Sequence, residues 1–216
     1  MIQYHKIQSL FKRDQKGKML FDKYSLPEFE YLKNNLWEFT EKVDGTNIRI
    51  MYSNGELSFG GKTDNAQIPT KLVNRLNELF KVQYFYSLFQ AIEQDDGWEY
   101  PEVCLYGEGY GAKIQKGGSN YIPNGVDFVL FDVKIGEWWL KREDVKYIAD
   151  KLGIMVVPII GEGNLDELAL MCEEGFNSQW GDFLAEGIVA RPKVELRDRA
   201  GHRIITKLKH KDFKDV

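Results

Sequence analysis

Short runs of β-prone residues, separated by turn residues, constrain the fold of this chain more than any other feature of its sequence. Asn54-Gly55 lies between two such runs, at 46–52 and 56–59, and this arrangement predicts a tight antiparallel hairpin. Apolar runs at 103–106 and 127–133 predict two buried strands. Because the expected strands outnumber the expected helices and hairpins are evident, we predict an α+β fold with antiparallel sheets.

Two longer stretches carry apolar residues at helical spacing. Residues 71–94 place Leu72 and Leu76 on one face, and we predict a single amphipathic helix over this range. Residues 141–152 show the same periodicity and are followed by Gly153, so a second helix is predicted to end there.

The composition is that of a globular protein. Aromatic residues make up 13% of the 216 residues, which argues against intrinsic disorder. No run approaches the roughly 20 apolar residues that cross a bilayer. Two cysteines cannot build the usual four-ligand zinc site, even with three scattered histidines. We therefore expect a cytoplasmic protein without a membrane partner.

The charge is distributed unevenly along the chain. The net charge is −4, yet residues 191–216 contain nine Lys or Arg and four acids and carry +5, which leaves −9 for the remainder. Such asymmetry is compatible with a polyanion site on an otherwise acidic surface. It is equally compatible with a solvated C-terminal segment, and the charge alone leaves both interpretations open.

Two glycine-rich stretches look like nucleotide-binding motifs but fail on spacing. Gly60-Gly61-Lys62-Thr63 lacks the earlier glycine of a P-loop, because Glu56 occupies that position, and no helix is expected to begin at the lysine. Residues 107–112 fit a degenerate dinucleotide-binding pattern, but the glycines that follow make a poor helix N-terminus.

A lysine flanked by acids is the sharpest chemical feature. Lys42 lies between Glu41 and Asp44-Gly45, just before a predicted strand, so its amine is expected in a turn. Taken alone, the pattern suits an exposed, charged entry to a hairpin. Further polar clusters adjoin predicted strands, and they are centred on Glu108, Asp132, Glu186 and the pair Lys207 and Lys209. Acids, an aromatic residue and a lysine pair at strand ends are groups that bind a nucleoside triphosphate with a metal.

In these residues the chain resembles the covalent nucleotidyltransferases, which comprise polynucleotide ligases and mRNA capping enzymes. Five motifs of that superfamily occur in order: Lys-x-Asp-Gly-x-Asn at 42–47, an acid at Glu108, an aromatic at Phe131, Glu-Gly-x-Val at 186–189, and Lys-x-Lys at Lys207 and Lys209. The stretches 107–116, 158–163 and 205–209 are most similar to nick-sealing RNA ligases of the RNA ligase 2 type.

The resemblance extends over residues 6–213 and carries expectations about the fold. It implies a nucleotidyltransferase (ATP-grasp-like) fold, in which antiparallel sheets flanked by helices enclose a central ATP cleft. It also implies a single adenylyltransferase domain over 1–216, without an additional C-terminal domain.

The resemblance implies that Lys42 is the nucleophile, which attacks the α-phosphate of ATP to form lysyl-AMP and release pyrophosphate. The AMP then passes to a 5′-phosphate, and a 3′-hydroxyl displaces it. Lys207 and Lys209 would disfavour the ammonium form of Lys42 and neutralise charge at the α-phosphate. Glu186 would orient a hydrated Mg²⁺ or Mn²⁺ ion.

The remaining residues implied to bind ATP are Glu41, Asn47, Lys62, Glu108 and Phe131. Phe131 would stack on adenine, Glu41 would lie close to the base, and Glu108 would accept hydrogen bonds from the ribose hydroxyls. Asn47 belongs to the same set. Lys62 occupies a position where the family usually has an arginine, so it keeps the charge but not the bidentate fork. On sequence grounds alone, Phe131 also fits an ordinary strand core.

The implied function is an ATP-dependent RNA ligase that joins 3′-hydroxyl and 5′-phosphate ends, acting as a monomer on RNA ends or nicked duplexes, including RNA–DNA hybrids. A DNA ligase, a capping-type nucleotidyltransferase and a non-catalytic module that binds nucleic-acid ends remain alternatives. The intact set of Lys42, Glu186 and the lysine pair favours an enzyme, because a binding module needs no nucleophile. Lys113, Lys116 and the basic C-terminal segment are expected to contact phosphates.

Overall fold

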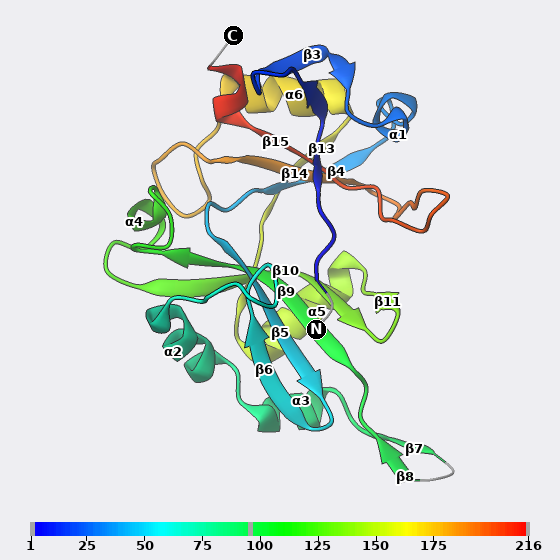
Figure 1. The fold of residues 1–216 in the computed structure, drawn as a ribbon, viewed down its shortest axis with the longest axis vertical. Helices are drawn as coiled ribbons and strands as arrows, with labels where there is room; N and C mark the ends of the chain where they lie inside the picture. Colours follow the sequence, from blue (N-terminus) through cyan, green and yellow to red (C-terminus); the bar gives the residue numbers. More distant parts are fainter. Residues whose placement is uncertain (1–2, 95–96, 215–216) are drawn as a thin grey trace. The chain divides into compact units, whose positions relative to one another are not determined.

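The computed structural model describes residues 3–94 and 97–214 (Figure 1) and divides into two compact units. Unit 1 comprises Met1–Tyr4 and Asp44–Val157, and unit 2 comprises His5–Val43 and Pro158–Val216. The chain therefore passes from one unit to the other directly after Tyr4, Val43 and Val157. The assignment of the whole chain to a single adenylyltransferase domain stays a prediction.

Unit 1 is built on a six-stranded sheet with the order β11-β10-β9-β5-β6, in which β12 also pairs with β10 (Figure 1). The strands are β5 (Thr46–Ser53), β6 (Glu56–Gly60), β9 (Val103–Gly111), β10 (Val126–Ile135), β11 (Trp138–Trp139) and β12 (Met155–Val156). The hairpin predicted at Asn54-Gly55 is confirmed. Both turn residues have positive φ, 50° and 76°, as a two-residue type I′ hairpin turn requires.

The helices of unit 1 correct one prediction. Residues 71–94 form two helices rather than one, α2 (Thr70–Leu79) and α3 (Val82–Leu88), followed by strand β7 (Ile92–Gln94), which pairs with β8 (Gly97–Glu99). Phe80 and Lys81 adopt extended backbone angles between the helices. Because Leu76, Phe80 and Phe85 are all buried, packing into one core outweighs the helical periodicity.

The remaining helices of unit 1 are α4 (Gly118–Tyr121) and α5 (Arg142–Leu152). The second predicted helix is confirmed as α5, which ends at Gly153 with φ of 66°.

The core of unit 1 covers one face of this sheet. Ile48, Ile50 and Leu105 pack there against apolar residues of α2, α3 and α5. Since side chains alternate along a strand, Asn47 and Glu108 lie on the opposite face. The sheet therefore has an apolar face toward its helices and a second face that carries polar and aromatic residues.

Unit 2 contains a five-stranded sheet with the order β1-β15-β14-β4-β13. Its elements are β1 (Gln8–Ser9), β2 (Phe11–Arg13), β3 (Met19–Tyr24), α1 (Pro27–Tyr31), β4 (Trp37–Glu41), β13 (Ile159–Gly163), α6 (Leu165–Glu174), β14 (Gly187–Pro192), β15 (Thr206–Lys209) and the 3-10 helix η1 (His210–Phe213). A separate core contains Trp37, Ile188, Leu208 and residues of α6. Asn164 begins α6 with a capping box to Glu167.

The predicted α+β class with antiparallel sheets is confirmed. Among the described strands, only the pairs β1–β15 and β10–β12 are parallel. In the described part of the chain, no helix has the length and apolarity that crossing a membrane requires.

Candidate active site

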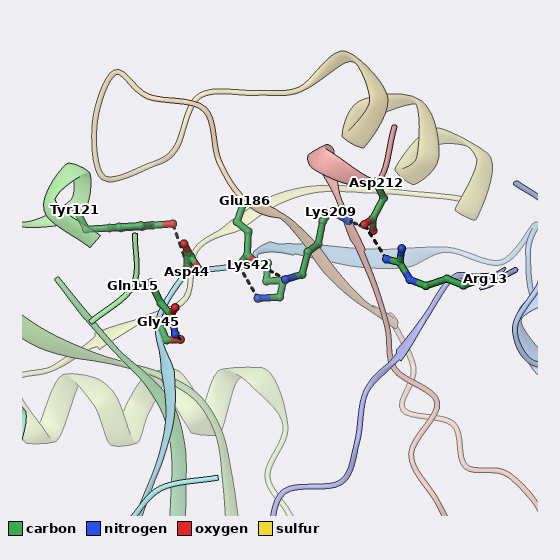
Figure 2. Close-up of polar contacts among 9 residues, drawn as sticks. All are labelled: Arg13, Lys42, Asp44, Gly45, Gln115, Tyr121, Glu186, Lys209 and Asp212. Carbon is green, nitrogen blue, oxygen red and sulfur yellow. Dashed lines mark hydrogen bonds and ion pairs between the residues drawn. The ribbon is translucent and has the colours of Figure 1, made fainter. Parts of the chain in front are cut away.

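Lys42 lies directly after β4 in unit 2. Its backbone N–H donates to the carbonyl of Gly187 at 2.9 Å, which fixes the turn against the start of β14. Its Nζ donates to Glu186 Oε2 at 2.5 Å, and the two side chains are 19% and 13% exposed (Figure 2). The candidate nucleophile is therefore held in a defined position, with part of its surface accessible.

The Glu186 carboxylate also forms an ion pair with a second lysine, Lys209. Lys209 Nζ lies 2.5 Å from Glu186 Oε1, so one carboxylate is shared by two ammonium groups (Figure 2). The strand register explains this meeting, because Gly187 pairs with Lys209 and Ile188 pairs with Glu41. Two cations on one anion leave a net positive charge, as an anion-binding site requires.

Gly187 allows the strands to approach closely enough for this arrangement. A Cβ atom at this position would lie 2.2 Å from the backbone oxygen of Leu208, far inside van der Waals contact. The glycine of the Glu-Gly-x-Val motif is thus required by the packing of β14 on β15.

Two residues that sequence reasoning missed hold the end of β15. Asp212 is 7% exposed, and its carboxylate accepts the backbone N–H of Lys209 at 3.2 Å and Arg13 Nη2 at 2.7 Å (Figure 2). Lys207 lies two residues before Lys209, on the same strand face, and is partly exposed. Asp212 has a local sequence signal, since it is the third residue after Lys209, the residue that caps the N-terminus of η1, whereas Arg13 has none.

Glu41 has protein partners for both carboxylate oxygens. It is 1% exposed and accepts Ser178 Oγ at 2.6 Å and the Gln179 backbone N–H at 2.8 Å. Burial raises the pKa of this carboxyl above its usual value, while the hydrogen bonds from Gln179 and Ser178 act in the opposite direction. The Glu41 side chain thus fastens the loop before β14, and its proximity to a base stays a prediction.

In unit 1, Asn47 and Glu108 lie directly opposite each other on β5 and β9. Asn47 Oδ1 is buried and makes no hydrogen bond. Buried polar atoms without a partner are rare in proteins. An acceptor of this kind beside a carboxylate fits a ligand that brings hydroxyl or amino donors.

Phe131 occupies a bulge of β10. The register with β9 shifts between Leu130 and Asp132, so Phe131 has no cross-strand partner, and it lies outside the described core cluster. Bulges re-aim side chains. The Tyr4 ring packs edge-on against it at 5.1 Å, and the Tyr4 hydroxyl donates to Asp132 Oδ2 at 2.7 Å. No sequence signal indicated Tyr4.

The residues that follow Lys42 in the motif are fixed within unit 1. The Asp44 backbone N–H donates to the Tyr121 hydroxyl at 3.1 Å, and Gln115 Nε2 donates to the Gly45 carbonyl at 3.0 Å (Figure 2). A Cβ at Gly45 would lie 2.3 Å from the Gly109 carbonyl oxygen, so this motif position also requires glycine.

The cations expected to contact nucleic acid differ in their surroundings. Lys62 is exposed in the loop after β6, and no helix begins there, in agreement with the excluded P-loop; Lys113 and Lys116 are exposed as well. In the basic C-terminal segment, several cations are paired with acids: Lys193 with Glu162, and both Arg197 and Arg203 with Glu195. Part of the segment's positive charge is thus neutralised locally.

The structure therefore groups the expected residues in two sets. Unit 2 brings together Lys42, Glu186 and Lys209. Lys207 lies on β15 with Lys209, and the Glu41 side chain bonds to the loop before β14. The sheet face of unit 1 carries Asn47, Glu108 and Phe131, whereas Lys62 is on the loop that follows this sheet's edge strand.

Comparison with known proteins places this fold among the RNA ligases. An RNA ligase of Naegleria gruberi solved with pyrophosphate superimposes with a TM-score of 0.66 at 16% identity, over 98% of this chain and 63% of that one. A variant of the Naegleria gruberi ligase solved with ATP and Mn superimposes with a TM-score of 0.65 at 17% sequence identity, over 88% of this chain and 55% of that one. A variant with AMP and Mn gives the same values.

The RNA ligase family model matches residues 35–209, and the chain belongs to this family. The resemblance seen in the motifs is thereby confirmed. The chain spans less than two thirds of the length of the solved ligases named above. A sequence search of curated proteins finds no match.

Proposed function

We propose that this protein is an ATP-dependent RNA ligase that works through a covalent lysyl-AMP at Lys42. The observation that carries the proposal is the Glu186 carboxylate shared between Lys42 and Lys209, 2.5 Å from each ammonium group. Membership of the RNA ligase family supports it. Further support comes from the Naegleria ligases, whose structures contain ATP, AMP and Mn.

In the first step, Lys42 Nζ attacks the α-phosphorus of ATP. Starting as an ammonium group, the Lys42 side chain loses one proton before Nζ attacks and a second one after the N–P bond has formed. The bond from phosphorus to the pyrophosphate oxygen breaks as the N–P bond forms. Lys207 and Lys209 neutralise the charge that develops on the phosphate oxygens.

Glu186 is the residue that would hold Mg²⁺ or Mn²⁺. In the described residues, no group of three or more His, Cys, Asp or Glu could hold a metal. A single carboxylate fits magnesium, which keeps most of its water ligands and also binds substrate phosphates. When bound, the ion supplies positive charge at the phosphates.

The nucleoside is bound by residues of unit 1. Phe131 stacks on adenine, because its position at a bulge frees it from the sheet's pairing. Asn47 and Glu108 accept ribose hydroxyl donors, and the unpaired Asn47 Oδ1 supports this role. Glu41 positions its loop near the base.

The second and third steps transfer AMP to a 5′-phosphate and join that end to a 3′-hydroxyl. Lys62, Lys113 and Lys116 are exposed cations that contact phosphates of the nucleic acid. Nicked duplexes containing RNA are the proposed substrate, and the protein acts as a monomer.

Incubation with ATP labelled at the α-phosphate, with Mg²⁺, tests the proposal. We expect label that stays on the denatured wild-type protein at alkaline pH and is released by acid, as a phosphoramidate requires, and none on Lys42→Arg, which keeps the charge but not the nucleophile. Protein without label, after intact mass has excluded prior adenylylation, would contradict the ligase mechanism. Label from GTP instead of ATP would favour a capping-type enzyme, and sealing of nicked DNA alone would favour a DNA ligase.

A further inference from the structure

Arg49 is a charged side chain with no exposed surface, and the proposed chemistry assigns it no role. It lies on β5 two residues after Asn47, and therefore on the same sheet face. A buried guanidinium destabilises a fold unless hydrogen bonds and an opposite charge satisfy its donors. The hydrogen-bond partners of Arg49 therefore indicate which part of the structure it stabilises.

Two of its partners belong to the loop after β6. Arg49 Nε donates to the Gly61 carbonyl at 2.7 Å, and its Nη2 donates to Asp64 Oδ1 at 2.9 Å. The two acceptors lie on either side of Lys62 in the sequence. A planar guanidinium holds both partners through donors in a fixed fork, a geometry that the ammonium group of a lysine does not provide.

The loop is also closed on itself. The Ala66 backbone N–H donates to the Thr63 carbonyl at 3.1 Å, and a Cβ at Gly61 would lie 2.8 Å from the Ala66 Cβ. Lys62 remains exposed on this turn, and the Asp64 side chain is 59% exposed. An exposed ammonium group thus lies on a turn that is anchored to a buried side chain.

We propose that Arg49 and Asp64 are positioning residues, which hold the Lys62 ammonium where it binds a phosphate group. The inference rests on the proposed function, because the phosphate belongs either to ATP or to the 5′ end of the nucleic acid. A lysine on an anchored turn loses less conformational entropy on binding than one on a free loop. The anchor therefore increases the affinity of a cation that lacks the fork of an arginine.

A double-mutant cycle between Asp64 and Lys62 tests this inference. Asp64→Ala removes the carboxylate at the exposed end of this ion pair. Because the variant also leaves the buried Arg49 guanidinium without this opposite charge, the free energy of unfolding of each variant is measured alongside the rate. We expect Asp64→Ala to slow the phosphate-dependent step about tenfold when Lys62 is present, and to have no further effect in the Lys62→Ala background. An equal loss of rate in the wild-type and Lys62→Ala backgrounds, or no loss of rate with Lys62 present, would overturn the inference.

The matched control is Asp150→Ala. It breaks an ion pair of unit 1 in which both side chains are exposed, with Lys146 Nζ 2.8 Å from Asp150 Oδ2, and it should leave the rate unchanged. A rate loss of the same size in this control would show that Asp64 acts through general destabilisation, and would overturn the inference.

Two assays identify the phosphate. A raised KM for ATP in the labelling of Lys42 assigns it to ATP, whereas slower joining of a pre-adenylylated strand, with ATP omitted, assigns it to the 5′ end. A wild-type protein without label contradicts the proposed function. In that case, hydrogen exchange of the backbone amides tests whether Asp64 holds the loop around Lys62. Faster exchange of the Ala66 amide in Asp64→Ala supports the positioning role, and unchanged exchange overturns it.

Discussion

Glu186 accepts two ammonium groups, and this single carboxylate decides the charge state of the proposed catalytic centre. Lys42 and Lys209 each lie 2.5 Å from it, on opposite oxygens. Two lysines in such proximity repel each other unless an anion separates them. The local sequence motifs predicted all three residues, because each lies at a strand end that its neighbours define. Arg13 and Tyr4 could not be predicted, since nothing near them in the sequence indicates the residues that they contact.

Replacing Glu186 by glutamine tests this arrangement. Glu186→Gln keeps the size of the side chain but leaves both lysines without a counter-charge and removes the proposed metal contact. We expect the rate of lysyl-AMP formation to fall by about 10²-fold or more, as is typical when one electrostatic contact to a transition state is lost.

The exposed Glu173, on α6 in the same unit, provides the matched control, and Glu173→Gln should leave the rate unchanged. A Glu186→Gln protein with the wild-type rate of labelling would exclude the assigned role.

At the scale of elements, the pairing of β14 with β4 and β15 brings the chemistry of unit 2 together. The register sets Gly187 opposite Lys209, so the carboxylate just before β14 reaches the lysine at the end of β15. Alternation and turn residues in the sequence predicted the β5–β6 hairpin. They could not predict the break at Phe80 and Lys81, because the apolar periodicity continues through it and only the tertiary core explains it.

Gly187→Ala should separate β14 from β15. The new Cβ would overlap the backbone oxygen of Leu208, which cannot give way as a flexible side chain can. We expect a loss of about 1–3 kcal/mol in the free energy of unfolding, together with slower lysyl-AMP formation as Lys209 shifts from Glu186.

Gly161→Ala in β13 is the control, because the nearest atom to its Cβ would be an ordinary 3.6 Å away. Equal stability losses in the two variants would show that the close approach at Gly187 has no special role.

At the scale of the whole molecule, each unit contains one buried, free cysteine, Cys104 in unit 1 and Cys172 in unit 2. Burial raises the pKa of Cys104 to about 11 and that of Cys172 to about 12. Both thiols are therefore neutral and inaccessible at pH 8. Thiol reactivity thus reports the folding of each unit separately.

We expect Ellman's reagent to modify neither cysteine in the native protein at pH 8 and both after unfolding. The thiols ionise near pH 9 in the unfolded chain but only at higher pH in the folded one, so the free energy of unfolding should fall as the pH rises above about 9. Rapid modification of the native protein would contradict the burial of these residues.

The division into units falls inside the motif that contains Lys42. Lys42 belongs to unit 2, whereas Asn47, five residues later, belongs to unit 1. The motif order and spacing predicted the family from the sequence. The division of the motif between two units could not be predicted, because it depends on which residues pack together in each core.

Locating the adenylyl group tests directly whether Lys42 is the nucleophile. The protein is incubated with ATP and Mg²⁺, digested, and its peptides are sequenced by mass spectrometry under conditions that preserve the phosphoramidate bond. We predict a single AMP adduct on Lys42. Stable AMP on another residue, or no adduct on a protein that still joins nucleic-acid ends, would contradict it.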